Sequence, residues 1–219
     1  MFKNLLKFEL ELHTRQVGFW ITAVIMFALG VVFVSADFAT ASEVGEKIKA
    51  NGAMAITNVI AGMSTAVIFF GTVFTVTGAM RDDVHKSLEL IHSTPVKSRD
   101  MIAARFSGVF LTTFLCIFAL TLGAFAGQFM PWTDKETLGP INVLYFLHPL
   151  VFFALPICLF VSTVYILLAG LTRNPTFVYI SAVGLLVITT LTGLVNEVDS
   201  PKTLGALIDP FGSNAVTNE

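Results

Sequence analysis

The sequence has little charge: Asp, Glu, Lys and Arg make up 13% of its 219 residues, about half the share in a soluble domain. Hydrophobic residues account for 55%, and the mean hydropathy is +0.80. A chain this apolar has too little polar surface for a water-soluble fold, so the composition predicts a polytopic membrane protein. The basic residues form no dense tract and the net charge is −2, which argues against nucleic acid as a partner, because phosphates need clustered cations.

Cysteine and catalytic motifs are also scarce. Cys116 and Cys158 both lie inside apolar runs, where a thiol is more often a small buried hydrophobe than half of a disulfide. No HExxH zinc motif, no GxxxxGK[ST] phosphate loop and no G-x-S-x-G serine turn occurs. We therefore expect no enzyme activity, no metal site and no bound cofactor within these residues. ATP-driven work would need ATP and Mg²⁺ on a partner ATPase.

Long apolar runs are what the sequence does contain. A helix needs roughly 20 residues to cross about 30 Å of hydrocarbon, and lipid tolerates no unpaired backbone groups. The first run resembles a signal peptide, but it is longer than a signal core of about 7–15 residues, so we expect it to be retained. The sequence thus predicts an all-α membrane protein whose transmembrane domain, residues 17–219, has five spans: 17–36, 53–80, 106–130, 144–172 and 175–195.

Small residues and prolines mark individual positions in these runs. Gly123 and Gly127 have the GxxxG spacing of closely packed helices, which we interpret first as packing and second as a dimer contact. Ser98 is expected to cap the helix that continues into the third run. Pro149 and Pro156 predict a kink or a broken first turn in the fourth run. The middle of the spans holds no ionisable residue, which weakens the hypothesis of an ion-coupled carrier.

The first 16 residues have the pattern of an interfacial helix. Its charged residues fall largely off a stripe of apolar residues at near-helical spacing. This stripe consists of Phe2, Leu5, Leu6, Phe8 and Leu12. We expect the stripe to lie in the headgroup region of the lipid bilayer and the charged side to face water. A short soluble extension of the first span is the alternative.

One polar island, residues 81–105, separates the second and third runs. Within it, Val84, Leu88 and Ile91 recur at i, i+4 and i+7, which predicts a short helix with one apolar face. Pro95 ends this pattern. A plain solvated connector needs no apolar stripe, so we favour a protein-docking helix.

The basic residues are distributed unevenly between the two sides of the membrane. With a cytoplasmic amino terminus, nine of the thirteen Lys and Arg lie in inside segments and four lie outside. We therefore expect the island 81–105 and a tight turn at 172–175 on the cytoplasmic side. Residues 37–51 and 131–142 are expected to be outside loops.

Several segments of this sequence resemble one family of membrane proteins. An amphipathic amino-terminal helix, two spans and then R-D-D-x-x-K-S-L-E-L-I-H-S-T-P-V-K-S-R-D resemble the type-2 ABC exporter permeases. More narrowly, three motifs resemble the membrane part of bacterial permeases fused to a zinc aminopeptidase-like domain. These are MFKNLLKFELELHTRQ at the start, M-P-W-x-D-x-E-x-L-G-P-x-N at 130–142, and L-x-A-L-I-D-P-F-G at 204–212.

This resemblance implies a function and a set of partners. The chain would be a permease subunit in the bacterial inner membrane that couples hydrolysis by a separate ABC ATPase to export of an unknown substrate. A second permease copy, in a homo- or heterodimer, is implied as well. Residues 1–16 would be the connecting helix, and residues 193–212 would lead to a sixth span that is apparently missing here, as is the peptidase-like part. The coupling helix would comprise Asp83, Val84, His85, Lys86, Ser87, Leu88, Glu89, Leu90, Ile91 and His92.

A different function stays open beside this one. The chain would then be a membrane anchor or scaffold for a fused or associated peptidase domain, without transport. The substrate, the direction of transport and the identity of the ATPase do not follow from the sequence.

Overall fold

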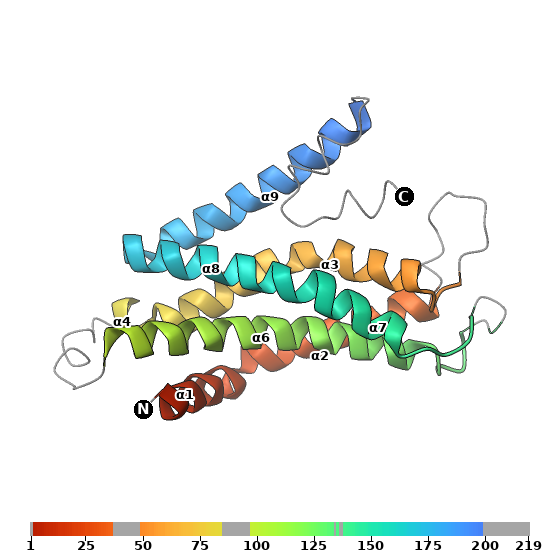
Figure 1. Cartoon of the computed structure of the whole chain (residues 1–219), viewed down its shortest axis with the longest axis horizontal. Helices are drawn as coiled ribbons and strands as arrows, with labels where there is room; N and C mark the ends of the chain where they lie inside the picture. The colour runs from red at the N-terminus through yellow and green to blue at the C-terminus, as the bar shows by residue number, and fades with distance from the viewer. Residues whose placement is uncertain (1, 37–48, 85–96, 134, 136–137, 199–219) are drawn as a thin grey trace.

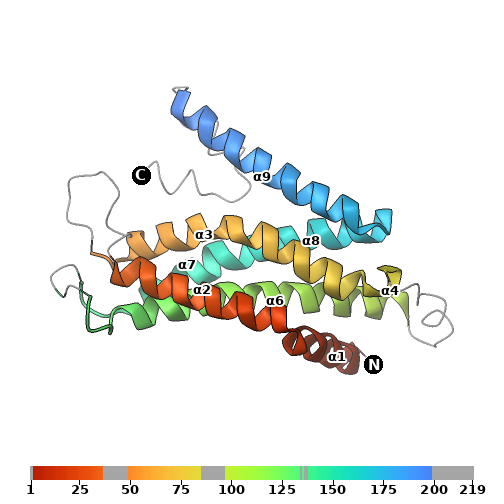
Figure 2. The same cartoon turned by 180° about the vertical axis from the view of Figure 1, so that it is seen from behind.

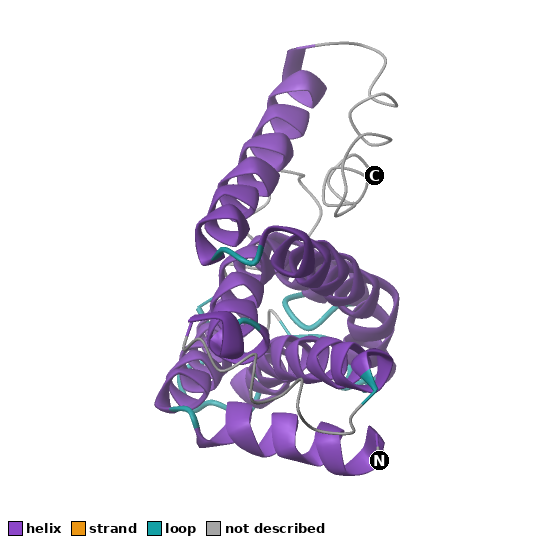
Figure 3. Ribbon diagram, turned by 90° about the vertical axis from the view of Figure 1, so that its left-hand side faces the viewer, coloured by secondary structure: helices purple, strands orange, loops and turns teal. Residues whose placement is uncertain are grey.

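The computed structural model describes residues 2–36, 49–84, 97–133, 135 and 138–198, and all regular structure among them is helical (Figures 1 and 3). In chain order the elements are α1 (Phe2–Arg15), α2 (Val17–Ser35), α3 (Ala53–Phe74), the π-helix η1 (Thr75–Ala79), α4 (Arg81–Val84), α6 (Ser98–Gly127), α7 (Leu144–Pro149), the π-helix η2 (Leu150–Ala154), α8 (Leu155–Thr172) and α9 (Pro175–Val198). The all-α class expected from the sequence is confirmed.

Four helical segments are long and apolar enough to cross a membrane. They are α2, α6, the continuous helix Leu144–Thr172, and Pro175–Thr192 of α9. A fifth crossing is counted only if the pair Ala53–Met63 and Thr65–Ala79, bent by 44°, is taken as one span. The chain is thus an all-helical protein with several membrane-spanning segments, and the predicted number of five depends on this bent pair.

Helices α2 and α6 run parallel and make the tightest contact in the bundle (Figures 1 and 2). A Cβ atom on Gly123 would lie 2.0 Å from the Phe27 carbonyl oxygen, and one on Gly127 would lie 2.8 Å from that of Val31. From the other side, a Cβ on Gly30 would lie 2.1 Å from the Leu120 oxygen. Only glycine permits this approach. The face that carries Gly123 and Gly127 is therefore occupied by α2 of the same chain.

The prolines of the fourth apolar run do not end the helix. The π-helix η2 lies between Pro149 and Pro156, and the segment Leu144–Thr172 continues through it. A π turn absorbs the hydrogen bond that a proline cannot make. The predicted interruption is therefore a local change of helical pitch.

Helix α6 begins one residue away from the predicted cap. Lys97 holds the N-cap position, no side chain caps the helix, and Ser98 is its first residue. The expected capping role of Ser98 was wrong, because its backbone already has helical geometry.

The tight turn at 172–175 is confirmed, since Arg173 ends α8 in the left-handed conformation (φ 49°) and Pro175 begins α9.

Polar contacts hold the bundle together at two levels. In the core, the Tyr165 hydroxyl of α8 donates to the Ile68 carbonyl of α3 at 2.8 Å. At the end where α3 begins, Asn51 accepts from the Gly139 amide at 2.6 Å and donates to its carbonyl at 3.0 Å. Helix α9 is different, because it diverges from the other helices and leaves most of its apolar side chains exposed (Figures 1 and 2).

Candidate functional site

Helix α1 packs on the bundle partly with ionisable side chains, whereas the core between the long helices is mainly apolar. Glu9 and His13, four residues apart on one face, are 4% and 1% exposed. Two glycines make room for them: a Cβ on Gly78 of η1 would lie 2.2 Å from the His13 ring, and one on Gly108 of α6 would lie 3.1 Å from Glu9 Cβ. The π turn of η1 therefore presents a bare backbone where α1 crosses.

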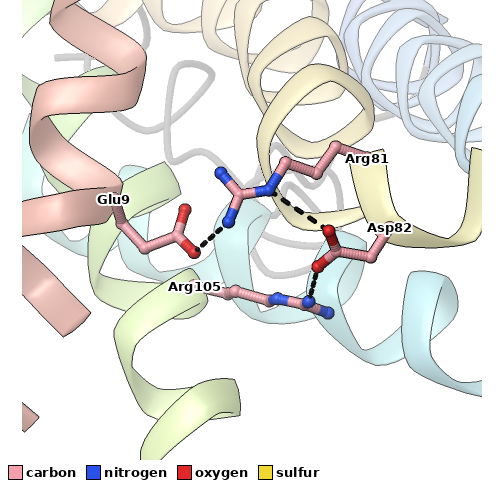
Figure 4. Close-up of polar contacts among 4 residues, drawn as sticks. All are labelled: Glu9, Arg81, Asp82 and Arg105. Atoms are coloured by element: carbon pink, nitrogen blue, oxygen red, sulfur yellow. Dashed lines mark hydrogen bonds and ion pairs between the residues drawn. The ribbon is translucent and has the colours of Figure 1, made fainter. Parts of the chain in front are cut away.

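Four charged side chains meet beside this crossing (Figure 4). We call Glu9, Arg81, Asp82 and Arg105 the arginine–carboxylate cluster. An Arg81 Nη atom lies 3.2 Å from a Glu9 carboxylate oxygen, and Arg81 Nε lies 3.4 Å from Asp82 Oδ1. Arg105 donates to Asp82 Oδ2. The cluster therefore joins α1, α4 and α6 through one chain of ion pairs.

The cluster is neutral as a whole but incompletely satisfied. The side chains of Arg81 and Arg105 are 19% and 12% exposed, so the pairs are largely out of water. Within the described residues, Glu9 Oε2, Arg81 Nη1 and Arg105 Nε have no hydrogen-bond partner. Each such atom costs about 1–3 kcal/mol, and buried ion pairs are a weak source of net stability. We interpret the cluster as a device that fixes geometry.

Burial also shifts the ionisation of α1. The pKa of Glu9 is raised, because desolvation outweighs the attraction of Arg81 and Arg105. The pKa of His13 is lowered to about 4 by desolvation and then by the nearby charge of Arg81. His13 is therefore neutral at physiological pH, and neither of its ring nitrogens has a partner among the described residues.

The docking helix predicted at residues 83–92 lies mostly outside the described residues. Only Asp83 and Val84 belong to them, as the last two residues of α4, and only their backbone is described. The structure shows where the segment leaves and returns: α4 and the start of α6 lie at the same end of the bundle (Figure 1). Asp82 and Arg105, which precede and follow the segment, are paired with each other.

The predicted apolar stripe of α1 is only partly turned to solvent. Leu5, Leu6 and Leu12 are partly buried, and the side chain of Phe2 lies outside the described residues. Phe8 is 52% exposed, and its ring centroid lies 4.9 Å from the Arg81 guanidinium carbon. One side of the stripe therefore helps to cover the cluster by a cation–π contact.

Sequence reasoning missed the cluster. A charge is a recognisable signal in the middle of a span, whereas all four residues lie in α1 or near a helix end. The pairs join positions 72 and 23 residues apart, which no local pattern reveals. The sequence contains one signal of the crossing: Glu9 and His13 are four residues apart, so they share one face of α1, and both lie outside the apolar stripe.

Within the described residues, no group of three or more His, Cys, Asp or Glu side chains could hold a metal ion. Comparisons with protein-family models, curated proteins and solved structures give no match to this chain. The function must therefore be argued from the geometry of the cluster and its surroundings.

Breaking one pair of the cluster is expected to destabilise the protein. Arg105→Gln leaves the buried Asp82 carboxylate without its main partner on α6, and truncating one side of a buried pair costs about 3–5 kcal/mol. Adding Asp82→Asn removes the uncompensated charge, so the double variant should regain part of the loss. Thermal unfolding in detergent measures both.

A matched control comes from an exposed pair on α1. Lys7 and Glu11 lie 3.7 Å apart with side chains 78% and 51% exposed, so Lys7→Gln should cost at most about 0.5 kcal/mol. Equal losses for Lys7→Gln and Arg105→Gln would contradict the structural role of the cluster.

The buried imidazole predicts a pH dependence of stability. Because the pKa of His13 is lower in the folded chain, about 4, than its ordinary value of about 6.5, the unfolded chain alone takes up this proton between those values. Stability should therefore fall as the pH falls through this window. The raised pKa of Glu9 acts in the opposite sense, since its contribution is lost as the pH rises.

Comparing variants isolates the histidine. The loss of melting temperature from about pH 7.5 to about pH 5 should be smaller in His13→Gln than in the parent protein. The control His148→Gln removes an exposed imidazole and should leave the loss unchanged. An identical pH profile for His13→Gln and the parent would show that His13 is not buried in its neutral form.

Proposed function

We propose that this chain is the membrane-spanning permease subunit of an ATP-driven transporter, moved by a separate ATPase that docks on residues 83–92. One observation carries the proposal. Within the polar island, α4 ends at Val84 and α6 begins at Ser98, and the Asp82–Arg105 pair joins these two flanking helices. A partner that pushes on the island therefore acts on both flanks at once.

The ion pairs of the cluster connect the island to two other parts of the bundle. Arg81 connects α4 to α1 through Glu9. Arg105 connects α4 to α6, which is 30 residues long. Helix α6 is in turn locked to α2 where Gly123 meets the Phe27 backbone. Closely packed helices move as rigid bodies. A displacement at the island is thereby converted into a displacement of α1, α2 and α6.

The distribution of basic residues supports a cytoplasmic position for this end. Among the described residues, the end that holds the cluster carries Lys3, Lys7, Arg15, Arg81, Lys97, Arg99, Arg105 and Arg173. The opposite end carries Lys49 and Lys135. By the positive-inside rule, the amino terminus and the island face the cytoplasm of a bacterial inner membrane, where an ATPase has access to them.

The same function requires two contributions from outside the chain. ATP and Mg²⁺ belong to the partner, because the sequence has no phosphate loop. A second permease copy would cover part of α9, where several apolar side chains are exposed. Those more than half exposed on α9 include Phe177, Ile180, Val183 and Leu191.

Site-specific photo-crosslinking tests the docking of an ATPase. With p-benzoylphenylalanine in place of Leu88, irradiation of cells should yield an adduct in which mass spectrometry finds a protein with a phosphate loop. With the same group at Trp132, which is 67% exposed at the opposite end, no such adduct should form. The purified partner should then show ATPase activity that the permease stimulates.

The outcome that contradicts the proposal is equally defined. If positions 84–92 give no ATPase adduct while a peptidase is crosslinked elsewhere, the chain is a membrane anchor or scaffold. Replacing Leu88 and Glu89 together should abolish the ATPase adduct formed from a probe at His92 and leave membrane insertion intact.

A further inference from the structure

A cavity of about 820 Å³ opens between the amino-terminal part of α6 and the carboxyl-terminal half of α8. Its walls are mainly aliphatic and aromatic, and Ile102, Phe106, Ile166 and Leu167 contribute to them. Ile102 and Leu167 are 55% and 59% exposed, so the cavity is open to its surroundings. In a membrane these surroundings are the acyl chains of lipids.

Three arginines line the cavity, and two of them carry positive charge that is unpaired among the described residues. Arg99 in the first turn of α6, Arg105 of the cluster and Arg173 in the α8–α9 turn all line it. Arg99 and Arg173 are exposed and form no ion pair within the described part of the chain. Arg105 has a buried Nε without a partner there. No described lining residue is acidic, and the positive charge of Arg99 and Arg173 favours an anion.

We infer that this cavity binds one anionic phospholipid. The phosphate lies between the Arg99 and Arg173 guanidinium groups, and an acyl chain lies along the apolar wall formed by α6 and α8. Guanidinium groups bind phosphate oxygens in a bidentate manner, and basic pockets between transmembrane helices hold anionic headgroups. A ligand with a charged end and an aliphatic tail matches both parts of the cavity.

The cavity lies next to the arginine–carboxylate cluster, so a bound lipid could influence the arrangement of the cluster. Ala79 of η1 and Arg105 of the cluster both line it, so the lipid contacts the same elements that hold the two flanks of the island. The inference does not require an ATPase, because it rests only on the membrane-spanning fold, the apolar walls and the arginines. It can therefore fail or succeed independently of the proposed transport function.

Lipid selectivity measured on the purified chain tests the inference. The protein is titrated with phosphatidylglycerol or phosphatidylcholine in mixed micelles, and both melting temperature and lipid retention in native mass spectrometry are recorded. Phosphatidylglycerol should stabilise the parent protein more than phosphatidylcholine. In Arg99→Gln/Arg173→Gln, its affinity should fall roughly 30-fold, since two cations near a lipid phosphate contribute about 2 kcal/mol.

Two matched controls separate the cavity from general effects. Lys3→Gln/Arg15→Gln removes the same charge from the exposed side of α1 and should keep the preference for phosphatidylglycerol. Gly170 lines the cavity, and neither it nor Gly184 of α9 has an atom within 4 Å of an added Cβ. Both leucine side chains should therefore fit. Gly170→Leu should reduce lipid retention by filling the cavity, whereas Gly184→Leu should leave lipid retention unchanged.

Three results would overturn the inference. Equal stabilisation of the parent protein by both lipids would show that no anionic headgroup is selected. Equal loss of preference in both double variants would indicate a general surface attraction. Full stabilisation by glycerol 3-phosphate alone would show an anion site that needs no acyl chain.

Discussion

The pairing of Asp82 with Arg105 is the contact on which the account of this molecule depends. It joins the two ends of the polar island, α4 before residues 85–96 and α6 after them, and Arg81 extends the connection to Glu9 of α1. The charges are mostly removed from water, so separating them leaves uncompensated ions in a medium of low polarity. The cluster therefore holds its segments in one arrangement without contributing much net stability. The glycines at 78 and 108 serve it by letting α1 approach closely enough for Glu9 to reach Arg81.

The bundle has a tight half and a looser half. Helices α2 and α6 touch backbone to backbone at Gly30 and Gly123, and α1 is fastened to them by the cluster. Helix α8 is held to α3 by Tyr165 but parts from α6 toward the cluster end, where the arginine-lined cavity lies. Helix α9 shares few contacts with the rest. Movement imposed at the island thus acts on the tight half, and the looser half offers surfaces for lipid and for a second copy.

The sequence was sufficient for features that depend on length and period. Apolar runs predicted an all-helical protein with several membrane-spanning segments, and Pro175 was correctly placed at the start of the last helix. It was insufficient where tertiary contact decides. The 44° bend between Met63 and Thr65 lies beside Gly62 and Ser64, but small residues recur throughout this run and do not single out one position. The partner of Glu9 lies 72 positions away. The face of α1 that meets the bundle is polar, because glycines opposite it leave space that a pattern of apolar residues does not reveal. The docking helix stays a prediction, since residues 85–92 lie outside the described part of the chain.

The central claim is that the cluster transmits motion from the island to α1. Spin labels replace Lys7 of α1 and Met54 at the start of α3, both exposed side chains. Double electron–electron resonance spectroscopy then measures the distance between the two labels in the complex with the partner ATPase. Trapping the ATPase with ATP should shift the distance distribution in the parent protein. In Glu9→Gln/Arg81→Gln the ATPase should still bind, but the shift should disappear. The same ATP-dependent shift in both proteins would contradict the claim.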